Sequence, residues 1–112
     1  MKTNLTYVGN TALLELEGEV DAEHAAQLKR VFVKLREEDR RRVVLDLQKV
    51  SFVDSTGLGI LISLMRQLKE VDGELRLVGL QPEVRSIFEI TRLYKVFELR
   101  SSIEDALRDL NK

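Results

Sequence analysis

The chain has 112 residues, of which 44% are hydrophobic and 33% are charged, and its formal net charge at pH 7 is -1. This length suits one compact domain over residues 1–112, and the near-neutral charge gives no reason to expect binding to nucleic acid or to an acidic membrane surface. The absence of cysteine excludes disulfides, thiolate zinc sites and thiol nucleophiles. We expect neither a metal nor a cofactor.

The N-terminus and the apolar stretches carry no signal for export or membrane insertion. Residues 1–4 lack the apolar run of a signal peptide. The longest strongly apolar stretch, Leu58 to Met65, is much shorter than the roughly 20 residues of a membrane-spanning helix, and Gly59 and Ser63 interrupt it. We therefore expect a cytoplasmic protein.

The first 20 residues predict two strands joined by a tight turn. Leu5 and Tyr7 precede a Gly-Asn pair at residues 9–10, which is typical of a hairpin turn. Residues 11–17 then alternate between the two faces of a strand, with Leu14 and Leu16 on one side and Leu13 on the other. Gly18 is expected to end this second strand or to bulge it.

A helix and a central strand follow. Asp21 is a suitable N-cap for a helix that begins near Ala22. Apolar side chains at helical spacing form one stripe on it, at Ala25, Leu28, Phe32 and Leu35. Residues 43–47, rich in β-branched side chains, are typical of a strand covered on at least one face.

The middle of the chain predicts a loop, a helix and another strand. Residues 51–56 are expected to form the loop, and the helix is expected from about Gly57 to Val71. It should end at Asp72-Gly73, where glycine can adopt the left-handed conformation. Residues 75–78 are the next strand.

The last third of the chain predicts two more helices and a short edge strand. Pro82 is placed as the first residue of a helix whose buried side carries Val84, Ile87 and Phe88. Residues 96–99 are expected to form an edge strand. Ser101 and Glu104 have the spacing of a capping box at the start of the last helix.

The alternation of these elements favours an α/β fold: a single-domain mixed β-sheet of about four to five strands with parallel crossovers and about four helices.

The most informative segment is Asp-Ser-Thr-Gly at residues 54–57, between a central strand and a helix. Sites tend to gather at the carboxyl ends of parallel strands. The hydroxyl of Ser55 could cap backbone N–H groups of the helix, and the same groups could receive a phosphate on that hydroxyl. From these residues alone a cap is the commoner role. Gly57 and Gly59 are poor helix formers, which indicates a close approach of either the neighbouring strand or a docking partner.

The exposed side of the same helix offers candidate contact residues. Most of its apolar residues share one broad face at 100° per residue, whereas Ile62 falls outside that face, near Arg66. Gly59 and Ser63 lie on the opposite face. We therefore take four residues as candidate partner contacts: Gly59, Ile62, Ser63 and Arg66.

At these positions the chain resembles bacterial anti-sigma factor antagonists, the stand-alone STAS domains. The resemblance rests mainly on VSFVDSTGLG at residues 50–59. It is joined by GEVD at residues 18–21, GEL at residues 73–75 and IFEIT at residues 87–91. It covers nearly the whole chain and implies a STAS-like fold.

The resemblance also implies a phosphorylation switch. In this family an anti-sigma factor with serine kinase activity phosphorylates the serine after the aspartate, which is Ser55 here. The unphosphorylated antagonist binds that kinase and releases the sigma factor, and a serine phosphatase resets the serine. Asp21 and Asp54 match the acidic positions beside the acceptor, while Thr56 matches a neighbouring hydroxyl and Gly57 follows it.

Two other functions remain open at this point. Asp21 and Asp54 could form a carboxylate pair for acid–base catalysis, assisted by His24, but Asp21 is a natural helix cap and His24 is expected on an exposed helix edge. We therefore expect no enzyme. Alternatively, STAS-like domains also serve as scaffold or sensor subunits, some of them nucleotide-binding, and such a role would need no phosphorylatable residue at position 55.

Overall fold

The computed structural model describes residues 1–108 and 110. Within them five strands form one mixed sheet in the order β1-β2-β3-β4-β5, with β1 antiparallel to β2 and each later pair parallel. The strands are β1 (Lys2–Val8), β2 (Thr11–Val20), β3 (Arg42–Val53), β4 (Glu74–Val78) and β5 (Glu98–Arg100). The helices are α1 (Ala25–Glu37), α2 (Ser55–Glu70), α3 (Pro82–Ile90) and α4 (Ile103–Leu107), with 3-10 turns η1 (Ala22–His24) and η2 (Leu93–Lys95). The expected α/β class and the order of elements are confirmed.

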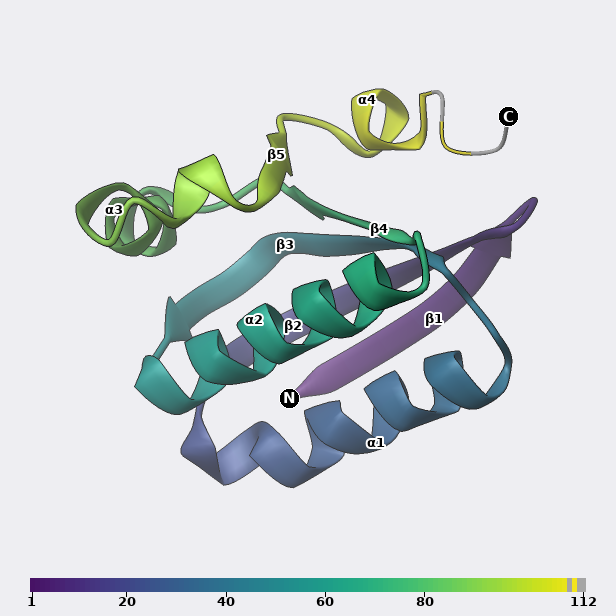
Figure 1. Cartoon of the computed structure of the whole chain (residues 1–112). Coiled ribbons are helices and arrows are strands. Elements are labelled where there is room, and N and C mark those ends of the chain that lie inside the picture. The colour runs from purple at the N-terminus through teal and green to yellow at the C-terminus, as the bar shows by residue number, and fades with distance from the viewer. Residues whose placement is uncertain (109, 111–112) are drawn as a thin grey trace.

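The main core lies between the sheet and the layer formed by α1 and α2, which run side by side across one face (Figure 1). Alternate residues of β2 and β3, such as Leu14 and Leu45, point into this core and are fully buried. They meet an apolar stripe of α2 that includes Leu61 and Leu64. The predicted apolar stripe of α1 is likewise buried at Leu28, Phe32 and Leu35, whereas Ala25 is half-buried.

The opposite face of the sheet is covered by α4. Leu13 and Val44, which alternate with the residues of the main core, form a second cluster with Val78 on β4 and with Ala106 of α4. Since α4 has only five residues, its apolar contact with the sheet is small.

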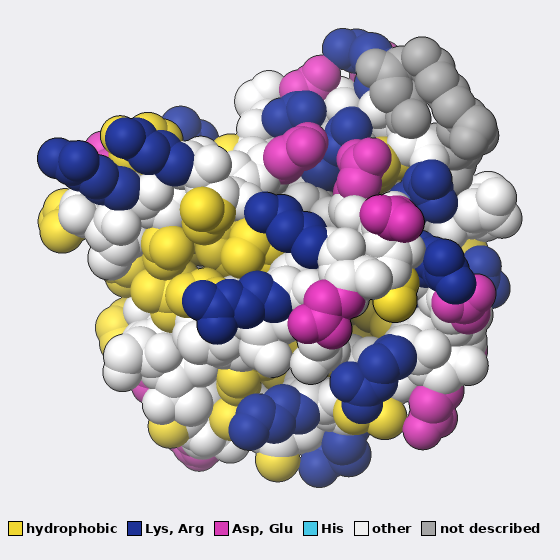
Figure 2. All heavy atoms as spheres, viewed as in Figure 1, with side chains coloured by type: hydrophobic (Ala, Val, Ile, Leu, Met, Phe, Trp, Pro, Cys, Tyr) yellow, Lys and Arg dark blue, Asp and Glu magenta, His cyan; other side chains and the backbone are white. Residues whose placement is uncertain are grey.

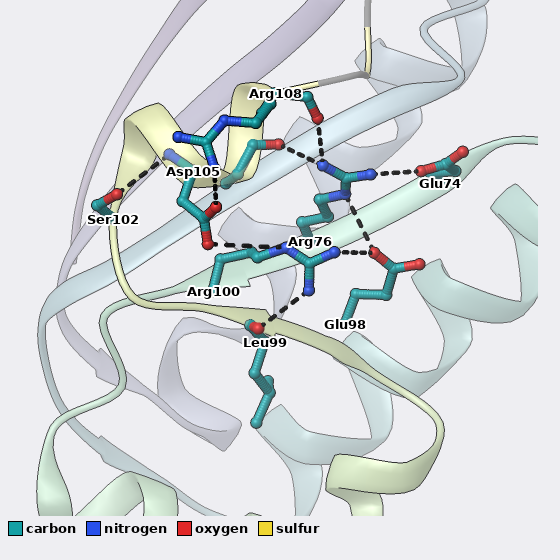
Figure 3. Close-up of polar contacts among 9 residues, drawn as sticks. Glu74, Arg76, Glu98, Leu99, Arg100, Ser102, Asp105 and Arg108 are labelled. Atoms are coloured by element: carbon teal, nitrogen blue, oxygen red, sulfur yellow. Dashed lines mark hydrogen bonds and ion pairs between the residues drawn. The ribbon is translucent and has the colours of Figure 1, made fainter.

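A group of charged residues supplements that contact, as Figure 3 shows. Arg76 on β4, which is 8% exposed, donates from Nη1 to the carbonyl oxygens of Ala106 at 3.0 Å and Arg108 at 2.7 Å. The same guanidinium pairs with Glu74 at 3.3 Å and with Glu98 at 3.1 Å. Further ion pairs link these groups to Arg100, Asp105 and Arg108. We call the set the Arg76 cluster: Glu74, Arg76, Glu98, Arg100, Asp105 and Arg108.

The boundaries around the candidate site differ from the sequence prediction. Residues 51–53, expected in a loop, are the last residues of β3, and α2 begins at Ser55 rather than Gly57 and ends at Glu70. The strand continues because Val50, Phe52 and Val53 pair with the last residues of β2, across a register shift that passes over Ser51. The loop that separates β3 from α2 is thereby reduced to Asp54.

Asp21 is an N-cap as predicted, and the helical turn η1 begins at Ala22, although regular α-helix follows only from Ala25. At the end of α2 the left-handed residue is Asp72, with φ of 57°. Gly73 is needed instead for space, since a Cβ there would lie 2.3 Å from the carbonyl oxygen of Arg41.

The C-terminal elements are shifted as well. The edge strand covers residues 98–100 rather than 96–99. Ser102, not Ser101, caps α4, and it accepts a hydrogen bond from the amide of Asp105 at 3.1 Å. Ile87, expected on the buried side of α3, is only half-buried, unlike Val84 and Phe88.

In the described part of the chain, no helix has the length and apolar character that crossing a bilayer requires.

Candidate functional site

The candidate site lies where the parallel strands β2 and β3 end side by side at the same edge of the sheet. Thr11 pairs with Arg42 and Val20 pairs with Val53. Between these two pairs β3 has two more residues than β2. Two register shifts in the pairing take up the difference, the second between Gly18 and Glu19. As a result the residues that follow the two strands, Asp21 and Asp54, lie next to each other.

Asp54 connects the two turns at this edge of the sheet. Its Oδ1 accepts a hydrogen bond from the amide of Gly57 at 2.8 Å and thereby caps α2. Its Oδ2 accepts from the amide of Ala22 at 3.0 Å, in the first turn after β2. One carboxylate therefore holds the start of α2 and the start of η1 together.

Asp21 is held by His24, the last residue of η1. Its Oδ1 accepts from the backbone amide of His24 at 3.1 Å and lies 2.8 Å from the ring Nδ1. Burial alone would raise the pKa of Asp21, but the hydrogen bonds from the amide and ring of His24, together with the charge of that ring, bring this pKa below its ordinary value. Asp21 is therefore an ionised acceptor within the turn.

His24 does not lie where the sequence placed it. It was expected on an exposed helix edge, yet it is half-buried against the carboxylate of Asp21. The signal that would have found this contact is the spacing of an acidic N-cap and a histidine three residues later, which lie on the same side of a helical turn.

Ser55 is the first residue of α2 and is exposed. Its hydroxyl makes no hydrogen bond to any residue that the structure describes, because Asp54 provides the cap that Ser55 was expected to provide. The expectation of a serine cap is therefore wrong. Of the amides in the first turn, that of Gly57 is occupied, whereas those of Ser55 and Thr56 have no acceptor among residues 1–108 and 110.

Gly57 and Gly59, near the start of α2, are explained differently by their surroundings. A Cβ on Gly57 would lie 2.0 Å from the carbonyl oxygen of Val20, so the end of β2 occupies that space. A Cβ on Gly59 would meet no atom of the described residues within 4 Å, apart from the adjoining backbone of its own helix. The strand therefore explains Gly57, and the packing of the described residues does not explain Gly59.

Four of the candidate residues lie along one line of α2. Ser55, Gly59, Ile62 and Arg66 are spaced by four, three and four residues, which places them on one side of a helix. Ile62 is half-buried and packs against the main core, so it is not the exposed isoleucine that the sequence suggested. Figure 2 shows an apolar area between α2 and α3, so this line of α2 is bordered by hydrophobic side chains on one side.

Ser63 lies beside that line of α2, on the side that faces α1. Its Oγ accepts a hydrogen bond from Nε2 of Gln67 at 3.3 Å, and the residue lines a groove between α1 and α2 together with Thr56 and Gly59. The structure thus brings Asp21, Asp54, Ser55 and Thr56 together at the strand ends, and we call these four residues the strand-end site. The candidate contact residues extend from there along α2.

Residues 2–106 match the family model described as "STAS domain". This chain belongs to the STAS domain family. Among curated relatives, the protein of Bordetella bronchiseptica named "Putative anti-sigma factor antagonist BtrV" is 34% identical over 95% of this chain and 91% of its own. The anti-sigma-B factor antagonist of Staphylococcus aureus is 30% identical over 81% of this chain and 84% of its own.

Solved STAS structures have the same fold. TM1081 of Thermotoga maritima, described as an anti-sigma factor antagonist, superposes with a TM-score of 0.93 at 21% identity, over 98% of this chain and 95% of that chain. The antagonist SpoIIAA of Bacillus superposes with TM-scores of 0.73 in its unphosphorylated form and 0.74 in its phosphorylated form, at 23% identity. These two matches cover 93% and 95% of this chain and 92% and 96% of SpoIIAA. The STAS domain described here therefore resembles both states of that protein equally well.

Proposed function

We propose that this STAS domain is an anti-sigma factor antagonist whose binding to an anti-sigma factor is switched by phosphorylation of Ser55. The observation that carries the proposal is the free, exposed hydroxyl of Ser55 beside a carboxylate, Asp54, that already caps the helix. Because Ser55 has no structural bond to lose, a kinase can modify it without unfolding the turn. Relatives named as anti-sigma factor antagonists support the same function.

The charges around Ser55 favour a local effect of the phosphate. A phosphate brings about -1.5 to -2 charges at pH 7. The start of α2 stabilises that charge by roughly 0.3–1 kcal/mol, while the carboxylates of Asp54 and Asp21 oppose it. Since these contributions partly cancel, we expect the fold to persist with little change in stability.

The large effect falls on the partner. A protein that packs over Ser55 and the line of Gly59, Ile62 and Arg66 would have to bury the new charge without a counterion. Placing an unpaired charge in an interface costs about 2–5 kcal/mol, which is a loss of affinity of roughly 30-fold to several thousand-fold. Phosphorylation would thus release the anti-sigma factor, and a serine phosphatase would restore binding.

Both carboxylates of the site support a regulatory rather than a catalytic role. Asp54 uses each of its oxygens to accept a backbone hydrogen bond, and Asp21, which is buried, accepts from the amide and ring of His24 at Oδ1. A general base needs an oxygen that is open to its substrate. The proposal assigns no catalytic residue, metal or cofactor to this chain, and it implies a cytoplasmic protein.

The experiment that tests the acceptor is intact-mass measurement after incubation with ATP, Mg²⁺ and each anti-sigma factor kinase of the source organism, followed by peptide mapping. We expect one phosphate on Ser55, no phosphate on Ser55→Ala, and normal modification of the adjacent control Thr56→Ala. Absence of modification with every kinase, or modification of Thr56 instead, would contradict the proposal.

A binding measurement tests the switch separately. Ser55→Asp should weaken binding of the kinase at least 30-fold, whereas Ser55→Ala should bind as the parent does. Ser101→Asp, which places the same charge in the exposed segment before α4, is the matched control and should leave the affinity unchanged. Equal affinities for Ser55→Asp and the parent would exclude the strand-end site as the contact.

A further inference from the structure

The groove between α1 and α2 has the character of a second binding surface. It has a volume of 460 Å³ and an apolar floor formed by Phe32, Ile60 and Leu64. Val33, which is 38% exposed, continues the apolar surface at the rim. The charged residues that line it are Lys29 and Arg36, and no carboxylate among the described residues lines it.

The charge of the two helices is opposite to that of the whole chain. Within their bounds α1 and α2 carry six Lys or Arg residues and two Glu residues, all exposed, whereas the net charge of the chain is -1. Figure 2 looks onto this layer and shows Lys and Arg side chains distributed over it. The surface therefore attracts an anionic partner, and the apolar floor requires that partner to have an apolar side as well.

Gly59, which also belongs to the proposed contact line of α2, supplies a further observation. A glycine within a helix is less favourable than alanine by about 0.8–1.0 kcal/mol, and here no neighbouring atom would oppose a side chain. Gly59 lines the groove, where any side chain would reduce its width. The missing side chain is explained if another molecule approaches the backbone of α2 at this point.

The dimensions of the groove favour a helix as the occupant. Its lining runs from Lys29 to Arg36 on α1 and from Thr56 to Gln67 on α2, which at 1.5 Å per residue is about 10 Å and about 16 Å along the two helices. A third amphipathic helix packs into such a groove with residues at i, i+3, i+4 and i+7.

We propose that the α1–α2 groove binds an amphipathic helix of a partner protein, with leucine-like side chains on the floor and carboxylates against Lys29 and Arg36. This surface shares Thr56 and Gly59 with the switch region and extends beyond it, to α1 and to the flank of α2 at Ser63 and Gln67. Arg36 and Gln67 already contact each other across it at 3.2 Å. The bound helix would replace that contact with a charged acceptor for Arg36.

The test is a titration of the full ¹⁵N-labelled chain, followed by NMR, with a synthetic amphipathic peptide of leucine and glutamate at helical spacing. We expect shift changes at α1 and α2 residues that line the groove, at physiological salt. A peptide with the same leucines and with lysine in place of glutamate should not bind there.

Charge reversals locate the contact. Lys29→Glu combined with Arg36→Glu should reduce the affinity for the glutamate peptide at least tenfold. The matched control combines Arg30→Glu with Lys34→Glu, which makes the same change of charge on α1 at residues that do not line the groove. It should have less than a threefold effect, because salt screens charges beyond about 8 Å.

A third variant separates binding from folding. Gly59→Leu should keep or raise the unfolding temperature and abolish peptide binding, because its side chain fills the groove. The proposal is overturned if the glutamate peptide causes no shifts, if its shifts map elsewhere, if both charge reversals have equal effects, or if Gly59→Leu binds normally.

Discussion

Two groups of charged side chains hold turns in place in this protein. They differ in whether a neighbouring polar group is left without a hydrogen bond. At the ends of β2 and β3, Asp21 and Asp54 hold two turns through backbone amides, and the hydroxyl of Ser55 beside them remains free. In the Arg76 cluster a guanidinium holds the end of α4 through two carbonyl oxygens, and its other nitrogens face carboxylates. Both arrangements position a turn, but only the first presents an unbonded nucleophile to solvent.

The comparison teaches that the density of charge does not identify a functional site. The Arg76 cluster contains six charged residues, yet they mainly satisfy one another and the carbonyl groups of α4. The strand-end site contains fewer charges, and the phosphoacceptor that we propose there is an uncharged serine. Mutations should therefore affect stability and binding differently at the two places.

The largest expected effect comes from the close contact beneath the strand-end site. Gly57→Ala would place a Cβ 2.0 Å from the carbonyl oxygen of Val20, so β2 and α2 must separate. We expect a loss of about 3 kcal/mol in the free energy of unfolding, measured with urea. Gly59→Ala is the control in the same helix and should stabilise the protein by about 1 kcal/mol. Similar values for both glycines would show that the approach of β2 is not tight.

The next effect tests the Arg76 cluster. Arg76→Ala leaves the buried end of α4 without its donor, and an unsatisfied buried group costs about 1–3 kcal/mol. We expect a loss of about 2 kcal/mol and faster hydrogen exchange in α4. Arg100→Ala removes a more exposed member of the same cluster and should cost less than about 1 kcal/mol. Equal losses of stability for Arg76→Ala and Arg100→Ala would show that the hydrogen bonds to the carbonyl oxygens of α4 contribute little.

A smaller effect distinguishes Asp54 from Ser55. Asp54→Ala removes the cap of α2 and the bond to Ala22, and we expect a loss of about 1–2 kcal/mol by urea unfolding. Ser55→Ala should change the stability by less than about 0.5 kcal/mol, as for an exposed residue without partners. The opposite order would mean that Ser55 is the cap and would weaken its assignment as a free acceptor.

The smallest effect concerns acid stability. The pKa of Asp21 is lower in the folded chain than its ordinary value of 3.8, so the unfolded chain binds more protons in this range. The contribution of Asp21 to stability is present above pH 3.8 and is lost as the pH falls through the lower, folded pKa. Asp21→Asn should therefore unfold with a weaker pH dependence below about pH 4, measured by urea titration. Parallel curves for Asp21→Asn and the parent would contradict the effect of His24.

Much of the fold followed from periodicity. The alternation of Leu13 with Leu14 predicted two faces of β2, and both faces are covered, one by the main core and one by α4. The exact ends were less predictable, because Ser51 and Phe52 suit a strand as well as a loop. Whether Ser101 or Ser102 caps α4 also depends on where the chain turns after β5, which local sequence does not determine.

The sequence indicated which residues form the candidate site, but not which of them caps the helix. Asp54, Ser55 and Thr56 can all cap a helix, and only the position of β2 decides that Asp54 takes this role and bonds Ala22 as well. The groove between α1 and α2 was missed for a similar reason. It depends on the packing of two helices that are separate in sequence, so no local motif predicts it.

The hydrogen bond between Asp54 and the amide of Ala22 joins residues 32 positions apart. It can form only after β2, α1 and β3 have assembled, because a loop of that length must close before the two turns meet. A ribosome-bound chain that has not paired these strands, or a short peptide around Ser55, lacks the arrangement altogether. A kinase that recognises the assembled turns would consequently act only on mature copies, which would keep unfinished chains out of the signalling pool.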